Sequence, residues 1–272
     1  MRETQYIKKN KNCRGCGSTR LKLWFGLGNQ PLANNLVYRK NLKKKENKFP
    51  LTLYYCQKCT LVQLIDIVNP KLLFDDYLYY SSTSPVFVEH FKQMASDFKK
   101  AGMYKTKLFG KSDLVIDIGS NDGIALKEFK KKGANVLGIE PAKEIAMKAM
   151  DDGILTIPEY FNSKLAKKIV DKFGEAKIVI FTNVFAHIDN SREMLKGVSI
   201  LLKAGGTLVL EFPYLPIMLQ EGTFDLIYHE HLSYFTRYSI EKLLEKNGFG
   251  VSKTEIVPVH GGSLRVFYRH IL

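Results

Sequence analysis

Residues 114–123 read LVIDIGSNDG, an apolar run that ends in an acid and passes directly into a glycine-rich turn. A second apolar run, residues 136–140, also ends in a carboxylate. Further apolar strands are expected over residues 178–181 and 207–211, with helix-like segments between the strands. Alternating strands and helices predict an α/β doubly wound sheet, with its ligand crevice at the carboxyl ends of the strands.

The turn distinguishes two classes of cofactor. A dinucleotide site needs Gly-x-Gly-x-x-Gly, so that the backbone can approach a pyrophosphate. Here Gly119, Asn121 and Gly123 form Gly-x-Asn-x-Gly after Asp117, and the second glycine is missing. The turn resembles the S-adenosylmethionine turn of class I methyltransferases, which surrounds the amino-acid portion of the cofactor. In that resemblance Glu140 accepts hydrogen bonds from the ribose hydroxyls, and nicotinamide binding is the main competing interpretation.

Two polar residues follow the strand at 178–181 in the segment FTNVFAHID. Class I methyltransferases often place substrate-facing residues at this position. We therefore group Asn183 with the cofactor-binding residues and His187 with the catalytic ones. The alternative for His187, a hydrogen bond to the backbone beside a core turn, has equal weight at this stage.

All four cysteines lie within the first 60 residues. Cys13 and Cys16 form CRGC, Cys56 and Cys59 form CQKC, and 39 residues separate the pairs. Two such knuckles with no cysteine left over predict a tetrahedral zinc site, which is structural because the protein supplies all four ligands. A redox pair or a disulfide framework is disfavoured by the expected compartment and by the missing strand–helix context of a thioredoxin-like motif.

The basic charge is concentrated in this same region. Of the net charge of +14, residues 1–60 carry +12, from 14 Lys/Arg and two acids. Nucleic acid, a nucleotide diphosphate or solvent alone could face such a surface. The start of the chain has no apolar signal segment, and no run approaches the roughly 18 apolar residues of a membrane span, so we expect a cytoplasmic protein without a membrane partner.

Residues 228–235 read YHEHLSYF, with two histidines, a glutamate and two tyrosines in eight positions and little that would serve as core. No regular element places Tyr228, Glu230 and His231 on one side. In a strand His231 points away from the other two, and helical spacing separates it from Glu230. The segment is therefore predicted to be a loop that carries acid/base groups.

The motifs of the whole chain occur in an order that resembles the zinc-containing sugar C-methyltransferases. They are Cys-x-x-Cys twice, PLAN, YLYYSSTS, VIDIGSNDG, GIEPA, NVFAHI, EFPYL, YHEHLSYF and HGGSLRV. Those enzymes methylate carbon 3 of nucleotide-linked 4-keto-6-deoxysugars. The resemblance implies a class I methyltransferase domain over residues 106–272, after a small β-rich zinc-binding domain (1–70) and a linker with a helix (71–105). It also implies S-adenosylmethionine and structural Zn²⁺ as cofactors.

The same resemblance implies an active site of five residues, namely Tyr79, His187, Tyr228, Glu230 and His231. Tyr79 is our choice among Tyr77, Tyr79 and Tyr80. Removing a proton beside a ketone requires a base and donors to the enolate oxygen. We assign His231 as the base because histidine has a near-neutral pKa. Glu230 would orient it or hold a sugar hydroxyl, and the two tyrosines and His187 would be donors or proton relays.

Family members continue beyond SLRV into a further α/β domain, whereas this sequence stops at Leu272. That domain is therefore expected to be absent. Two other functions remain. One is a nucleic-acid methyltransferase that binds its substrate through a basic zinc ribbon, although the sequence lacks a base-stacking catalytic motif. The other is a non-catalytic fragment that binds cofactor or a partner. His260 and Arg265 are secondary candidates for substrate contacts, and the sugar, its nucleotide, the stereochemistry and the oligomeric state stay open.

Overall fold

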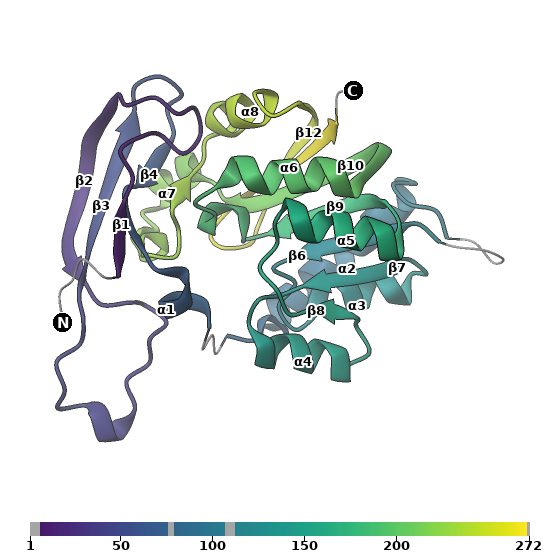
Figure 1. Ribbon diagram of the computed structural model, residues 1–272, viewed down its shortest axis with the longest axis horizontal. Coiled ribbons are helices and arrows are strands. Elements are labelled where there is room, and N and C mark those ends of the chain that lie inside the picture. Colours follow the sequence, from purple (N-terminus) through teal and green to yellow (C-terminus); the bar gives the residue numbers. More distant parts are fainter. Residues whose placement is uncertain (1–5, 76–78, 107–111, 271–272) are drawn as a thin grey trace.

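The computed structural model describes residues 6–75, 79–106 and 112–270. A small β-rich part lies beside a larger α/β part, and the two share one long boundary (Figure 1). Tyr77, one of the three tyrosines considered above, lies outside the described residues. Within the described ranges, none of the helices combines the length and apolar composition that crossing a bilayer needs.

The small part is built on an antiparallel four-stranded sheet in the order β11-β4-β3-β2. A separate two-stranded ribbon pairs β1 with β5. The strands of the small part are β1 (Ile7–Lys9), β2 (Leu21–Gln30), β3 (Phe49–Cys56), β4 (Val62–Leu64) and β5 (Asp66–Val68). The lysine-rich stretch between β2 and β3 is exposed apart from three partly buried positions, and a single 3-10 turn, Arg39–Asn41, interrupts it.

The fourth strand of that sheet comes from far along the chain. β11 (Ser233–Tyr234) pairs with β4 and belongs to the YHEHLSYF segment. The prediction of a loop over the whole segment was therefore wrong at its end. It was also wrong about core, since Leu232, Tyr234 and Phe235 are buried in hydrophobic clusters. This segment joins the two parts of the molecule.

A short helix and a long helix connect the small part to the large one. α1 (Pro70–Phe74) is followed by a 3-10 turn, Ser81–Thr83, and then by α2 (Pro85–Lys100). The Ser84 side chain accepts a hydrogen bond from the Phe87 backbone N–H, and Pro85 occupies the first turn, as expected of a helix start. The apolar stripe of α2 packs on the large sheet through Phe91, Met94 and Phe98.

The large part contains a seven-stranded sheet in the order β12-β13-β10-β9-β6-β7-β8. Only β13 runs against the others, because it pairs antiparallel with both of its neighbours. The strands are β6 (Leu114–Ile118), β7 (Asn135–Ile139), β8 (Thr156–Ile157), β9 (Ala176–Thr182), β10 (Leu202–Pro213), β12 (Phe249–Val257) and β13 (Ser263–His270). The expected doubly wound α/β fold is confirmed, with strand ends shifted by one to five residues.

Helices cover both faces of this sheet (Figure 1). The helices are α3 (Ile124–Lys131), α4 (Lys143–Asp151), α5 (Ser163–Phe173), α6 (Ser191–Leu201), α7 (Leu215–Glu221) and α8 (Arg237–Glu245). Alternate residues of β9 point to opposite faces: Val179 and Phe181 join the cluster under α5, α6 and α8, whereas Ile178 and Ile180 join the one under α2 and α3. Burial on both faces explains why the strands read as nearly continuous apolar runs.

Candidate active site

A cavity of about 510 Å³ opens at the carboxyl ends of β6, β7 and β9. Both parts of the molecule line this cavity: Asn34 comes from the small part, and Gly119 and Glu140 come from the large one. Its volume lies within the usual range for a site that encloses a small organic ligand. The crevice therefore lies where the sheet topology predicts it.

The turn after β6 forms one wall and can only be made with glycine at its first position. Gly119 has φ +73°, and a Cβ there would lie 2.4 Å from Val184 Cγ2. Gly123 has φ +76° and is the N-cap residue of α3 (Ile124–Lys131). The backbone of this turn can therefore approach a ligand closely.

Buried carboxylates surround the turn. The pKa of Asp117 is raised well above its usual value by burial and by the nearby Glu140 carboxylate. Among the described residues, none donates a hydrogen bond to Asp117 Oδ1 or to either carboxylate oxygen of Asp122. Such buried oxygens fit a ligand that brings cationic or hydroxyl donors.

Glu140, at the end of β7, lines the cavity. Its Oε2 accepts from the Asn121 backbone N–H at 3.0 Å, and its Oε1 accepts from the Ala142 N–H at 2.9 Å. Each carboxylate oxygen keeps a second lone pair for a further hydrogen-bond donor. The Asn121 side chain has another contact: it donates to the Tyr79 carbonyl and accepts from the Ser81 N–H, which ties the turn to the YLYYSS segment.

The structure also brings two of the cavity-lining residues, His187 and His231, together. Their ring centroids lie 4.9 Å apart, although 43 residues separate them in the chain. His187 ends a short 3-10 turn after β9, and its Nε2 is buried without a partner among the described residues. Burial, reinforced by His231, lowers the pKa of His187 well below its usual value, so this imidazole is neutral.

The tautomer of His231 follows from its two partners. Its Nδ1 lies 2.8 Å from the Leu226 carbonyl oxygen, which can only accept, so Nδ1 carries the proton. Its Nε2 is 3.1 Å from the Tyr228 hydroxyl, which donates to it. Burial lowers the pKa of His231 to about 4, further than the near-neutral value expected from the sequence. His231 is therefore a neutral imidazole with its lone pair on Nε2.

Glu230 turns toward the small part of the molecule. Its Oε1 accepts from Asn34 Nδ2 at 2.7 Å, and burial raises the pKa of Glu230 to about 7 despite this bond. The Leu226 carbonyl, and not Glu230, orients the His231 ring in this structure. Of the two described tyrosines in the YLYYSS segment, Tyr79 is among the residues that line the cavity.

The two secondary candidates differ in position. His260 lines the cavity in a left-handed conformation and lies 4.9 Å from the Phe87 ring. Arg265 is buried in an ion-pair network with Glu211 and Glu255, at 2.8 Å from each. Arg265 is therefore a sheet residue, and a substrate contact is not its role here.

The four cysteines meet at one point of the small part. Their sulfur atoms all lie within 4.8 Å of one another. Both short distances run from one knuckle to the other: Cys13 Sγ lies 3.5 Å from Cys59 Sγ, and Cys16 Sγ lies 3.6 Å from Cys56 Sγ. Four thiolates at this spacing fit a tetrahedral zinc ion and leave no open coordination position.

The buried neutral His231 makes the folded state sensitive to acid. Its pKa is about 4 when folded and about 6.5 when unfolded, so between these values only the unfolded chain binds the proton. Its contribution to the free energy of unfolding is present above pH 6.5 and is lost as the pH falls toward 4, by about 3 kcal/mol at most. Urea unfolding at pH 7 and pH 4 measures this effect. Between these two pH values, the free energy of unfolding of the wild type should fall by up to about 3 kcal/mol more than that of His231→Asn. Identical pH dependence of the two would contradict a neutral buried His231.

Several residues of the site were not predicted from the sequence. Asp122 stands in the quoted turn itself and could have been found there. Asn34 and Asp189 line the cavity, and Arg14 is connected to it through its contact with Asp189. The PLANN segment was the one available signal for Asn34.

Two family models match the chain. A methyltransferase domain model matches residues 88–254, more than half of the chain. The chain belongs to this methyltransferase domain family. A zinc binding domain model matches residues 13–74, which include all four cysteines. A class I methyltransferase sheet preceded by a small zinc-binding domain is therefore confirmed.

The chain is 35% identical to C-methyltransferase NovU from Streptomyces niveus over 262 residues, which are 96% of this chain and 61% of NovU. It thus spans about three fifths of that relative's length. The PH0226 protein of Pyrococcus horikoshii OT3 has a similar fold, with a TM-score of 0.53 at 16% identity over 74% of this chain and 98% of that one. An S-adenosylmethionine-dependent methyltransferase from Clostridium acetobutylicum has a TM-score of 0.51 at 9% identity, over 68% and 92%.

Proposed function

We propose that this protein is an S-adenosylmethionine-dependent C-methyltransferase that acts on carbon 3 of a nucleotide-linked 4-keto-6-deoxysugar through an enolate. The observation that carries the proposal is the chain Leu226 carbonyl–His231–Tyr228, which presents a basic imidazole nitrogen and a hydroxyl at a cavity beside the methyltransferase turn. The similarity to a C-methyltransferase supports transfer to carbon. Identity to NovU extends through both the zinc-binding and the methyltransferase parts.

The turn and its buried carboxylates fit the cofactor. Glu140 would accept from the ribose hydroxyls, and Asp117 and Asn183 offer buried oxygens to the amino-acid portion; the turn residues Gly119, Asn121 and Gly123 would hold the backbone close to it. When bound, S-adenosylmethionine supplies an electrophilic methyl group. Excluding water from the buried wall strengthens every polar contact made there.

His231 and Tyr228 would remove the proton from carbon 3. Burial raises the pKa of Tyr228, so its hydroxyl stays protonated and donates to His231 Nε2. As the Tyr228 oxygen takes the proton of carbon 3, its own proton passes to Nε2, and the electron pair of the broken C–H bond becomes the enolate. The neutral imidazole is ready for this step at pH 7, whereas a protonated one could not accept.

A base with a pKa of about 4 is weak, so the enolate oxygen needs donors. His187 has a buried Nε2 without a partner among the described residues, and Tyr79 lines the same cavity. These two side chains would donate to the ketone oxygen as its charge develops; one well-placed donor of this kind is worth roughly 3 kcal/mol. Glu230, which titrates near neutral pH beside Asn34, would hold a sugar hydroxyl.

A substrate panel tests the proposal. The protein is incubated with methyl-labelled S-adenosylmethionine and nucleotide 4-keto-6-deoxysugars, each paired with the matching 4-hydroxy sugar. Label is expected only in the ketosugars, because only these form an enolate. A polynucleotide arm at several salt concentrations tests the basic surface, since phosphate binding weakens steeply with salt. Intact cofactor binding without transfer to any ketosugar would instead favour a non-catalytic binding protein.

A further inference from the structure

Arg14 is an arginine enclosed between the two parts of the molecule. Its side chain is only 1% exposed, although it carries a charge. It stands in the first zinc knuckle, between Cys13 and Cys16, so metal binding would fix its backbone on both sides. A buried guanidinium is stable only when its donors are matched by acceptors, and those acceptors indicate what it holds.

Gln63 links this arginine to the metal site. It is fully buried; its Nε2 donates to Cys13 Sγ at 3.2 Å, and its Oε1 accepts from the Arg14 N–H at 2.9 Å. Groups that bind a metal's ligands in this way orient them. The position of Arg14 is therefore coupled to the position of the Cys13 thiolate.

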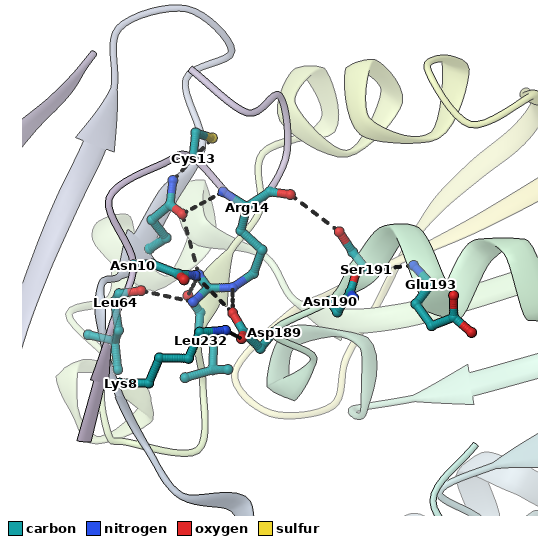
Figure 2. Close-up of polar contacts among 11 residues, drawn as sticks. Lys8, Asn10, Cys13, Arg14, Leu64, Asp189, Asn190, Ser191, Glu193 and Leu232 are labelled. Carbon is teal, nitrogen blue, oxygen red and sulfur yellow. Dashed lines mark hydrogen bonds and ion pairs between the residues drawn. The ribbon is translucent and has the colours of Figure 1, made fainter. Parts of the chain in front are cut away.

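The Arg14 guanidinium also contacts the segment that carries His231 (Figure 2). Its Nη1 donates to the Leu232 carbonyl at 2.8 Å, and its Nη2 donates to the Leu64 carbonyl at 3.0 Å. Leu232 directly follows His231, and its own N–H donates to the Ala186 carbonyl at 2.9 Å, directly before His187. The backbone of one residue, Leu232, thus connects Arg14 with the segments that carry both histidines.

A second contact reaches the other histidine. Arg14 Nε lies 3.4 Å from Asp189 Oδ1, two residues after His187 in a segment that lines the cavity. Lys8 Nζ and Asn10 Nδ2 also bind this carboxylate, at 2.8 and 2.9 Å. Figure 2 shows the small part of the molecule converging on Asp189 through these three side chains.

We propose that Arg14 is a positioning residue that sets the spacing of the His187–His231 pair, and that zinc binding acts on the active site through it. This inference rests on the proposed function for the roles of the histidines. Arginine is required because its planar fork has donors in three directions, toward Leu232, Leu64 and Asp189. A lysine would keep the charge but could not hold all three acceptors at once.

Arg14→Lys tests the proposal in the zinc-loaded full chain. Imidazole nitrogen NMR signals, assigned with single His→Gln variants, report the geometry of each histidine. We expect the His187 and His231 signals to shift and that of His90 to stay. The kcat for methyl transfer should fall about tenfold to a hundredfold, while zinc content stays near one per chain and the Kd for S-adenosylmethionine changes less than about twofold.

The matched control is Lys246→Met. Lys246 also binds a knuckle, donating to the Cys16 carbonyl at 2.9 Å, but it does so from the end of α8 and away from the cavity. It should leave the His187 and His231 signals and kcat unchanged. Unmoved signals in Arg14→Lys, or equal shifts in both variants, would overturn the proposal.

Two further cases keep the test decisive. If Arg14→Lys does not fold, Asp189→Asn replaces it, because that change removes the charge facing the guanidinium and leaves the zinc ligands intact; the same signals must then shift. If the wild type methylates no ketosugar, the proposed function fails. The NMR signals and cofactor affinity would still decide whether Arg14 positions the two histidines.

Discussion

His231→Ala is expected to lower methyl transfer by about a thousandfold while the Kd for S-adenosylmethionine changes less than about twofold. The change removes the imidazole that accepts from Tyr228 in the described part of the chain, so Tyr228 cannot pass on its proton as it takes that of carbon 3. Among the described residues, the hydrogen bonds of His231 go to Tyr228 and Leu226 and not to the cofactor turn after β6. Single-turnover methyl transfer and solvent deuterium exchange at carbon 3 measure the two steps, and both should fall together.

His229→Gln is the matched control for this prediction. His229 lies four residues before β11, and its Nε2 lies 3.1 Å from the Phe49 carbonyl oxygen, a contact that a glutamine amide can replace. Its activity should stay within a few-fold of wild type. Deuterium exchange that survives in His231→Ala would show that another group removes the proton.

Cys56→Ser is expected to release zinc and unfold the small part of the molecule. Cys56 is fully buried and ends β3, and zinc binding contributes on the order of 10 kcal/mol to the folding of such domains. Methyl transfer should be lost as well, because β11, Asn34 and Arg14 all connect the small part to the cavity. Cofactor affinity should fall far less, since the turn lies on the large sheet.

Zinc content, thermal unfolding and limited proteolysis measure this outcome. Lys58→Gln serves as the control, because Lys58 lies in the same knuckle but is exposed and supplies no ligand. It should retain zinc and its melting temperature. A full equivalent of zinc in Cys56→Ser with unchanged proteolysis would contradict a four-cysteine structural site.

Local patterns were sufficient for the elements that carry the cofactor turn. The strand at residues 114–118 and the two cysteine knuckles each depend on neighbours within a few positions, and both appear as expected. β11 was missed because its partner, β4, lies about 170 residues away. Ser233 and Tyr234 form a strand only by pairing with β4, so two residues alone give no local strand pattern.

The sequence by itself determined the cofactor turn and the metal site, because residue spacing defines both: Gly-x-Asn-x-Gly directly after a strand, and two pairs of cysteines. Only the tertiary structure decided the chemical state of the acid/base residues. Burial makes His231 a neutral imidazole, and Asn34, 196 residues from Glu230, takes that carboxylate as its partner. Burial and long-range hydrogen bonds depend on how the two parts of the molecule pack, and this packing cannot be predicted from residue spacing.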